Sequence, residues 1–121
     1  MALILVVEDA ADFRTLLCEA LEISGHKVVL SKSGKEALRQ CRGRSFDVVV
    51  TDVVMPDVDG IELIRALRAL PRQVPIIAIS GASVDMLEIV KALGAQATLR
   101  KPFDLQELLA AINQVLGKQQ D

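Results

Sequence analysis

The chain has 121 residues, 51% of them hydrophobic, and a formal net charge of −2, a size and composition that fit one domain able to bury its own core. The negative charge and the scarcity of aromatic residues, with three Phe and no Trp or Tyr, disfavour direct nucleic-acid binding, which needs a basic field and stacking platforms. No apolar run reaches the roughly 20 residues of a membrane span and the start lacks a basic leader, so we expect a cytoplasmic protein without membrane contact.

Five short apolar runs recur along the chain. They lie at residues 3–7, 27–30, 47–51, 76–80 and 97–99. Runs that are apolar on both faces are typical of parallel strands covered by helices on both sides. We therefore predict that these five runs are the strands of one parallel sheet.

Helical patterns separate the runs. The first and last have apolar residues at three- and four-residue spacing: Phe13, Leu16, Leu17, Ala20 and Leu21, then Leu105, Leu108, Leu109, Ile112 and Leu116. Shorter patterns lie within residues 37–41, 61–67 and 86–93. Gly25 and Gly94 stand where helices should end, and Ser33 and Ser83 where they could be capped. The order predicts an α/β fold of five βα units in three αβα layers.

The domain organisation follows from the same pattern. We expect one domain over residues 1–117 and a disordered tail over residues 118–121. The sequence has no linker, internal repeat or change of composition that would mark a second domain. Cys18 and Cys41 lack metal-ligand spacing, and both fall in helical patterns where a free thiol acts as a small apolar residue.

Polar residues end four of the predicted strands: Glu8 and Asp9 after the first, Asp52 after the third, Ser80 at the fourth and Lys101 after the fifth. The carboxyl ends of parallel strands share one edge, where ligands of such sheets gather. Carboxylates at buried strand ends are costly unless a cation meets them. The pattern predicts a divalent metal site, with Asp9 and Asp52 as direct ligands and Glu8 acting through water.

Such a site could transfer a phosphoryl group. With the charge of the site compensated by a cation, the Asp52 carboxylate could attack phosphorus and become an aspartyl phosphate. Lys101 would neutralise one phosphoryl oxygen, and the Ser80 hydroxyl could donate a hydrogen bond to another.

The blocks VVED, TDVVMPDVDGIELI, ISG and GAQATLRKPF, in this order, resemble the response-regulator receiver domains of two-component signalling. The resemblance covers nearly the whole chain. It implies a flavodoxin-like sheet in the order 2-1-3-4-5, and phosphoryl transfer to Asp52 from a sensor histidine kinase or a phosphotransfer protein. It also implies Mg²⁺, with Mn²⁺ as a substitute, held by Glu8, Asp9, Asp52 and the Val54 carbonyl.

Further expectations come from the same resemblance. Lys101 and the switch hydroxyl of Ser80 would contact the phosphoryl group, and the bond before Pro102 would be cis. The chain would catalyse only its own phosphorylation and a slow autodephosphorylation. Its changed surface would bind a downstream protein, as a monomer or as a weak phosphorylation-dependent dimer.

Three positions depart from the commonest family pattern. Thr98 stands where an aromatic residue usually couples the site to the output surface, so coupling through an aromatic rotamer is absent there. Val54 and Ala82 replace side chains that in many relatives are polar and could position a water, which predicts no built-in acceleration of aspartyl-phosphate hydrolysis.

Val84 and Leu87 are expected on the side of the fourth helical pattern that faces away from its apolar stripe. They are either incidental surface residues or part of a partner-binding face.

Other interpretations remain open from sequence. Asp9 or Asp12 could be a helix cap. Asp57 and Asp59 mimic the acidic pair of aspartate-nucleophile phosphohydrolases, although they follow Met55-Pro56 in a loop. A scaffold that does not need phosphorylation usually lacks the acceptor or the lysine, and both are present. The chain ends soon after the last helical stripe, which favours a single-domain protein, whereas a relay shuttle or a receiver module of a longer regulator or hybrid kinase would have the same sequence.

Overall fold

The computed structural model describes residues 2–53, 60–81 and 84–120, with the side chains of residues 84–85 and 118–120 also outside the description. Within these ranges five strands form one sheet: β1 (Leu3–Val7), β2 (Lys27–Ser31), β3 (Val48–Asp52), β4 (Ile76–Ser80) and β5 (Ala97–Arg100). All neighbouring pairs are parallel, in the order β2-β1-β3-β4-β5. The predicted strands and their order are confirmed, with shifts of one residue at some ends.

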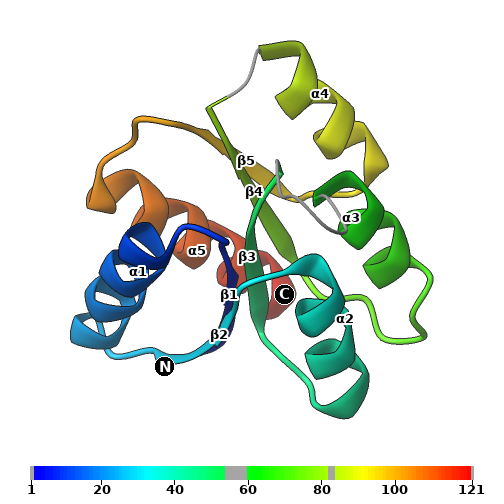
Figure 1. Ribbon diagram of the computed structural model, residues 1–121, viewed down its shortest axis with the longest axis horizontal. Coiled ribbons are helices and arrows are strands. Elements are labelled where there is room, and N and C mark those ends of the chain that lie inside the picture. Colours follow the sequence, from blue (N-terminus) through cyan, green and yellow to red (C-terminus); the bar gives the residue numbers. More distant parts are fainter. Residues whose placement is uncertain (1, 54–59, 82–83, 121) are drawn as a thin grey trace.

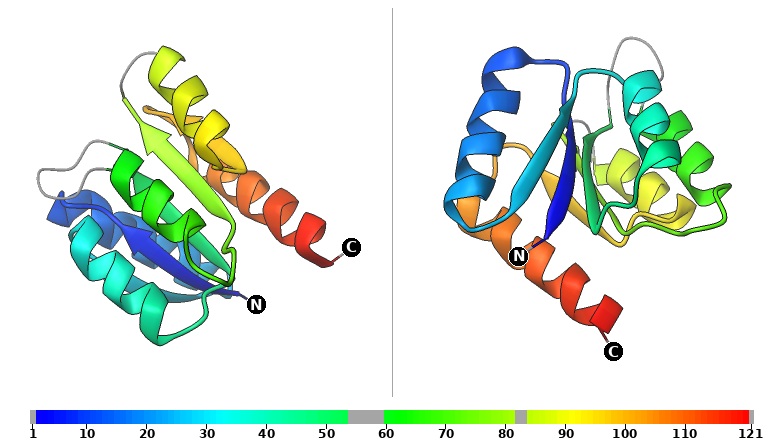
Figure 2. Two further views of the ribbon diagram at one scale, coloured as in Figure 1. Left: turned by 90° about the vertical axis from the view of Figure 1, so that its right-hand side faces the viewer. Right: turned by 90° about the horizontal axis from the view of Figure 1, so that it is seen from below.

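In the part of the chain that the structure describes, five helices cover the sheet: α1 (Ala11–Ile23), α2 (Gly34–Gly43), α3 (Gly60–Arg68), α4 (Val84–Leu93) and α5 (Leu105–Gln120). Helices α1 and α5 lie on one face, and α2, α3 and α4 on the other (Figure 1). Figure 2 shows the same three layers from two further directions. Every residue of β3 and β4 is buried, because these central strands are covered on both faces.

Helix ends follow local chemistry. The Ser33 hydroxyl accepts a hydrogen bond from the Glu36 N–H at 3.2 Å and so caps α2 as predicted. Gly25 and Gly94 have positive φ values of 95° and 127°, a conformation that glycine adopts without a Cβ penalty. Ala10 is the N-cap of α1 and makes no side-chain cap bond. Neither Asp9 nor Asp12 is therefore the cap of this helix, and that interpretation is wrong.

Some predicted core residues lie outside the core. Leu16 and Ile89 are 60% and 49% exposed, because each stands at the border of its helix's apolar face, and spacing alone does not set how far a helix turns on the sheet. Leu105 is 40% exposed and is the first residue of α5. Leu87, which we expected on the outer side of α4, is half-buried. Among the remaining predictions, those on Val54, Asp57, Asp59, Ala82 and Ser83, and on the side chain of Val84, lie outside the described residues.

The end of the chain is more regular than we expected. Helix α5 continues to Gln120 and thus includes three residues that we assigned to a disordered tail. Lys and Gln have high helix propensities, so nothing local stops the helix after Gly117. The domain boundary at residue 117 stays a prediction.

Candidate functional site

Three carboxylates meet at the carboxyl edge of the sheet. Glu8 follows β1 and is 2% exposed, Asp52 is the last residue of β3 and is 8% exposed, and Asp9 is exposed. One carboxylate oxygen from each lies within 4.8 Å of the others. Pairing of Val7 in β1 with Thr51 in β3 sets this proximity, because both strands then end at one level. The sequence prediction that these three residues converge is confirmed.

Lys101 supplies the positive charge of the site. Its Nζ lies 3.0 Å from Asp52 Oδ2 and 3.3 Å from Glu8 Oε1. Burial lowers the pKa of Lys101, but the hydrogen bond and negative charge of Asp52, with a further contribution from Glu8, raise it above its ordinary value. The Lys101–Pro102 peptide bond is cis, as the resemblance implied. The lysine is therefore charged and directed at the predicted acceptor.

Glu8 shows how crowded the carboxylates are. Burial raises its pKa to about 7, and the charge of Asp52 and a hydrogen bond with Asp9 act in the same direction. The Ala10 N–H, 3.2 Å from Glu8 Oε2, and the charge of Lys101 act against this rise. The positive charge of Lys101 therefore does not fully neutralise the negative charge of the three carboxylates. A hard divalent cation, which prefers oxygen ligands, fits this donor set.

The remaining predicted residues differ in their placement. Ser80, the last residue of β4, is fully buried and pairs in the sheet with Arg100, next to Lys101. The Lys101 N–H donates to the Ser80 carbonyl at 2.9 Å, so this hydroxyl-bearing residue and the lysine stand side by side. Thr98 is half-buried in β5 opposite Ala78. The Val54 carbonyl lies outside the described residues.

Sequence reasoning missed three residues that shape the site. Arg14 donates from Nη1 to the Glu8 carbonyl at 2.9 Å and so holds the chain where β1 ends. The Phe13 ring centroid lies 4.6 Å from Lys101 Nζ. A Cβ on Gly60 would lie 2.6 Å from the Asp52 carbonyl oxygen, so only glycine lets α3 begin this close to Asp52. Only Gly60 had a usable signal, since an Asp-Gly pair often marks a tight turn.

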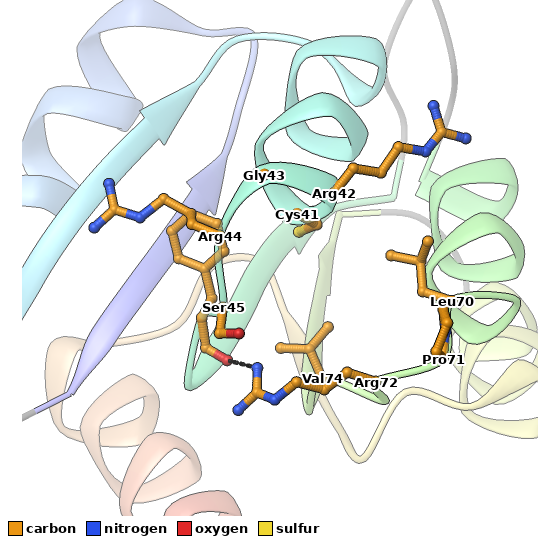
Figure 3. Close-up of a pocket in the computed structure, with 10 residues that line it drawn as sticks. Cys41, Arg42, Gly43, Arg44, Ser45, Leu70, Pro71, Arg72 and Val74 are labelled. Atoms are coloured by element: carbon orange, nitrogen blue, oxygen red, sulfur yellow. Dashed lines mark hydrogen bonds between the residues drawn. The ribbon is translucent and has the colours of Figure 1, made fainter.

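Two cavities differ in their relation to these groups. One, of about 390 Å³, is lined by residues 41–46, 70–72 and 74. Figure 3 shows it beyond the end of α2, with Arg42, Arg44 and Arg72 around it and the Arg72 guanidinium bonded to the Phe46 carbonyl at 3.1 Å. None of its lining residues belongs to the carboxylate site. The other, of about 370 Å³, is lined by Phe13, Lys101, Pro102 and Phe103 and adjoins the site through the lysine.

No helix in the described part of the chain is long and apolar enough to cross a lipid bilayer.

Comparison with known proteins identifies the family. Residues 4–113 match the response regulator receiver domain. The transcriptional regulatory protein PrrA of Mycobacterium tuberculosis is 37% identical over 116 residues, which are 95% of this chain and 50% of that protein. The chain spans about half the length of the first curated relatives it matches.

Solved structures agree with this match. A response regulator receiver domain from Clostridium thermocellum superimposes with a TM-score of 0.92 at 30% identity, over 99% of this chain and 98% of that one. The receiver domain of a sensor histidine kinase from Pseudomonas aeruginosa PAO1, solved with a magnesium ion in its active site cleft, gives 0.89 at 29% identity, over 96% and 98%. With its flavodoxin-like (βα)₅ fold and its acidic strand ends, the chain belongs to the response regulator receiver domain family.

Proposed function

We propose that the chain is a phosphoacceptor switch and that Asp52 takes the phosphoryl group of a phosphohistidine on a sensor histidine kinase or a phosphotransfer protein. A carboxylate oxygen of Asp52 attacks phosphorus, the new O–P bond forms as the histidine N–P bond breaks, and the electron pair stays on the histidine nitrogen. The observation that carries this proposal is the placement of Asp52, at the end of β3 with the Lys101 ammonium 3.0 Å from its Oδ2.

The same site would hold a divalent cation. Glu8, Asp9 and Asp52 offer oxygen ligands within 4.8 Å of one another, and the Val54 carbonyl completes the set that the resemblance implies. Mg²⁺ is our choice because the set is all oxygen, and the Pseudomonas relative contains it; Mn²⁺ would be a substitute. When bound, the ion would supply positive charge that lets an anionic phosphoryl group approach the carboxylates.

Lys101 and Ser80 would respond to the product. The ammonium group can follow the negative charge from the Asp52 carboxylate to a phosphoryl oxygen, because its side chain is one-third exposed and long enough to move. The Ser80 hydroxyl would donate a hydrogen bond to another phosphoryl oxygen. These two residues would therefore distinguish the phosphorylated from the unphosphorylated state.

The consequence of phosphorylation would be altered protein binding rather than turnover of a substrate. The relatives are transcriptional regulators, and twice the length of this chain leaves room in them for a further domain. A downstream protein target, a monomeric or weakly dimeric state, a cytoplasmic location and a slow autodephosphorylation are our proposals for this chain. Thr98, half-buried in β5, offers no aromatic ring to relay the change.

Acetyl phosphate with Mg²⁺ tests the acceptor directly. We expect one added phosphoryl group per chain by intact mass, none without a divalent cation, and none on the Asp52→Asn variant. Asp12→Asn is the matched control, because Asp12 is an exposed carboxylate in the first turn of α1 and should leave the gain unchanged. Equal gain on Asp52→Asn and the parent would disprove the acceptor assignment, and continued phosphate release beyond one equivalent would favour a phosphohydrolase.

A further inference from the structure

Phe13 provides a contact for Lys101 that involves no carboxylate. The ammonium nitrogen lies over the Phe13 ring, 4.6 Å from its centroid, within the range of a cation–π interaction. The two residues are far apart in sequence, and helix α1 brings the ring to the lysine from the side of the sheet that α5 also covers (Figure 1). Lys101 is thus held by three groups: Glu8, Asp52 and an aromatic face.

A second ring fixes the orientation of the first. Phe103 packs edge to face against Phe13, with centroids 6.0 Å apart and planes inclined by 68°, an arrangement that aromatic pairs favour. Phe103 follows the lysine across Pro102, so the same connection that carries the ammonium group also carries the ring that supports its aromatic partner. Both rings are half-buried and line the 370 Å³ cavity beside the lysine.

The aromatic contact matters most when the carboxylates are engaged elsewhere. A divalent cation on Glu8, Asp9 and Asp52 would compete with Lys101 for the oxygens that it contacts at 3.3 and 3.0 Å. A lysine that loses those partners gains side-chain freedom and moves toward solvent. The Phe13 ring attracts the ammonium through its quadrupole and does not compete for the metal.

We propose that Phe13 is a positioning residue that keeps Lys101 beside Asp52 once a metal ion occupies the carboxylates. This inference rests on the proposed phosphoacceptor function. Phe13 touches neither the phosphoryl donor nor the metal in this proposal, and it acts only through Lys101. A substitution that removes this contact should lower the rate of Asp52 phosphorylation at saturating metal and should leave the affinity for the metal unchanged.

The test compares three residues at one position. Phe13→Leu keeps an apolar side chain of high helix propensity but removes the aromatic face, whereas Phe13→Tyr keeps it. At saturating Mg²⁺ and with acetyl phosphate as donor, we expect Phe13→Leu to be phosphorylated about fivefold more slowly than the parent, which corresponds to ~1 kcal/mol at tenfold per 1.4 kcal/mol. Phe13→Tyr should be within about twofold of the parent, and all three should bind Mg²⁺ within about twofold of one another.

A spectroscopic signature separates positioning from a general loss of structure. The methylene protons next to Lys101 Nζ should show an upfield ring-current shift in the Mg²⁺-bound parent and in Phe13→Tyr, because the aromatic ring stays over the lysine when the metal is bound. An unchanged rate in Phe13→Leu would overturn the inference. Equal slowing of the Leu and Tyr variants would also overturn it by indicating a structural role, and so would the absence of the ring-current shift in the Mg²⁺-bound parent, because Lys101 would then have left the ring.

The proposed function can fail separately. If Asp52→Asn accepts as much phosphoryl as the parent, the acceptor assignment fails whatever Phe13 does. If Asp52→Asn accepts none while Phe13→Leu equals the parent, the acceptor stands and the role of Phe13 is refuted.

Discussion

At the amino edge of the sheet the Arg68 guanidinium is surrounded by neutral oxygen acceptors, whereas at the carboxyl edge the Lys101 ammonium is shared by the carboxylates of Glu8 and Asp52. Arg68 donates from Nε and Nη2 to the Gly94 carbonyl at 3.2 and 2.9 Å, and to the side-chain oxygens of Gln96 and Gln73 at 3.0 and 3.1 Å. Lys101 instead faces more negative charge than it can neutralise.

The difference separates stabilisation from function. The Arg68 network joins the end of α3 to the segment between α4 and β5, and the same Gln96 oxygen also accepts from the Ile76 N–H at 2.8 Å. A charge whose donors are satisfied by neutral acceptors stabilises the fold. The carboxylate cluster carries unfavourable repulsion in the absence of a metal ion, and that repulsion favours the binding of one.

Gly60→Ala should have the largest effect, because it acts on the backbone that supports the carboxyl edge. The new Cβ would lie 2.6 Å from the Asp52 carbonyl oxygen and 2.8 Å from that of Val53, so strand and helix must separate. We expect a loss of about 3 kcal/mol in the free energy of unfolding, measured by chemical denaturation, together with weaker Mg²⁺ binding.

The control for this substitution is Gly43→Ala, where no atom lies within 4 Å of the new Cβ. Alanine at this helical position should leave stability unchanged or raise it by about 0.5 kcal/mol. Similar unfolding curves for the two variants would contradict the close approach of α3 to the Asp52 backbone.

Arg68→Met tests the amino edge. It keeps the apolar stem but removes every donor of the network and leaves the partly buried Gly94 carbonyl without its guanidinium partner. We expect a loss of about 2 kcal/mol in the free energy of unfolding and no change in Mg²⁺ affinity beyond about twofold. Arg65→Met is the matched control, because Arg65 is exposed on the same helix. A large loss of Mg²⁺ affinity in Arg68→Met would show that the two edges are coupled.

Glu8→Gln should stabilise the metal-free protein at the carboxyl edge while weakening metal binding. The folded pKa of Glu8 is about 7, above its ordinary 4.5, so the unfolded chain holds fewer protons between these values. This group's contribution to stability is therefore complete below pH 4.5 and is lost as the pH rises through about 7. At pH 8 we expect Glu8→Gln to gain about 1 kcal/mol over the parent without metal.

The pH dependence provides the check on this prediction. The fall in metal-free stability between about pH 5 and 8 should be smaller in Glu8→Gln than in the parent, and Mg²⁺ affinity of the parent should rise with pH over the same range, because the ion binds the ionised carboxylate. Glu19→Gln, on the exposed face of α1, should behave like the parent. A parent whose metal-free stability rises over this range would refute the raised pKa.

Much of the site could be predicted because it depends on strand ends. Asp52 and Ser80 are the last residues of β3 and β4. Because all strands of a parallel sheet run in the same direction, their last residues meet at its carboxyl edge. Which residues of each helix are buried was harder to predict. Leu16 has the same spacing as its buried neighbours, yet it is exposed, since how a helix rolls on the sheet depends on all the side chains beneath it.

The contact between Phe13 and Lys101 had no signal in the sequence. Phe13 belongs to the apolar stripe of α1 and Lys101 to a segment after the last strand, and no local pattern relates an aromatic ring to a lysine so far along the chain. Arg68 is similar, because an arginine at the end of an amphipathic helix is ordinarily solvated. Its neutral partners come from two other segments of the chain.

The order of apolar runs and helical stripes along the sequence was enough to determine the (βα)₅ fold. Parallel pairing of the strands then specifies that their carboxyl ends meet, and this brings together Glu8, Asp9, Asp52, Ser80 and Lys101. Only the tertiary structure decided how the charges are compensated: a shared ammonium and a raised Glu8 pKa at one edge, and a satisfied Arg68 at the other. Burial and distance set the strength of an electrostatic interaction, and both exist only once the chain has folded.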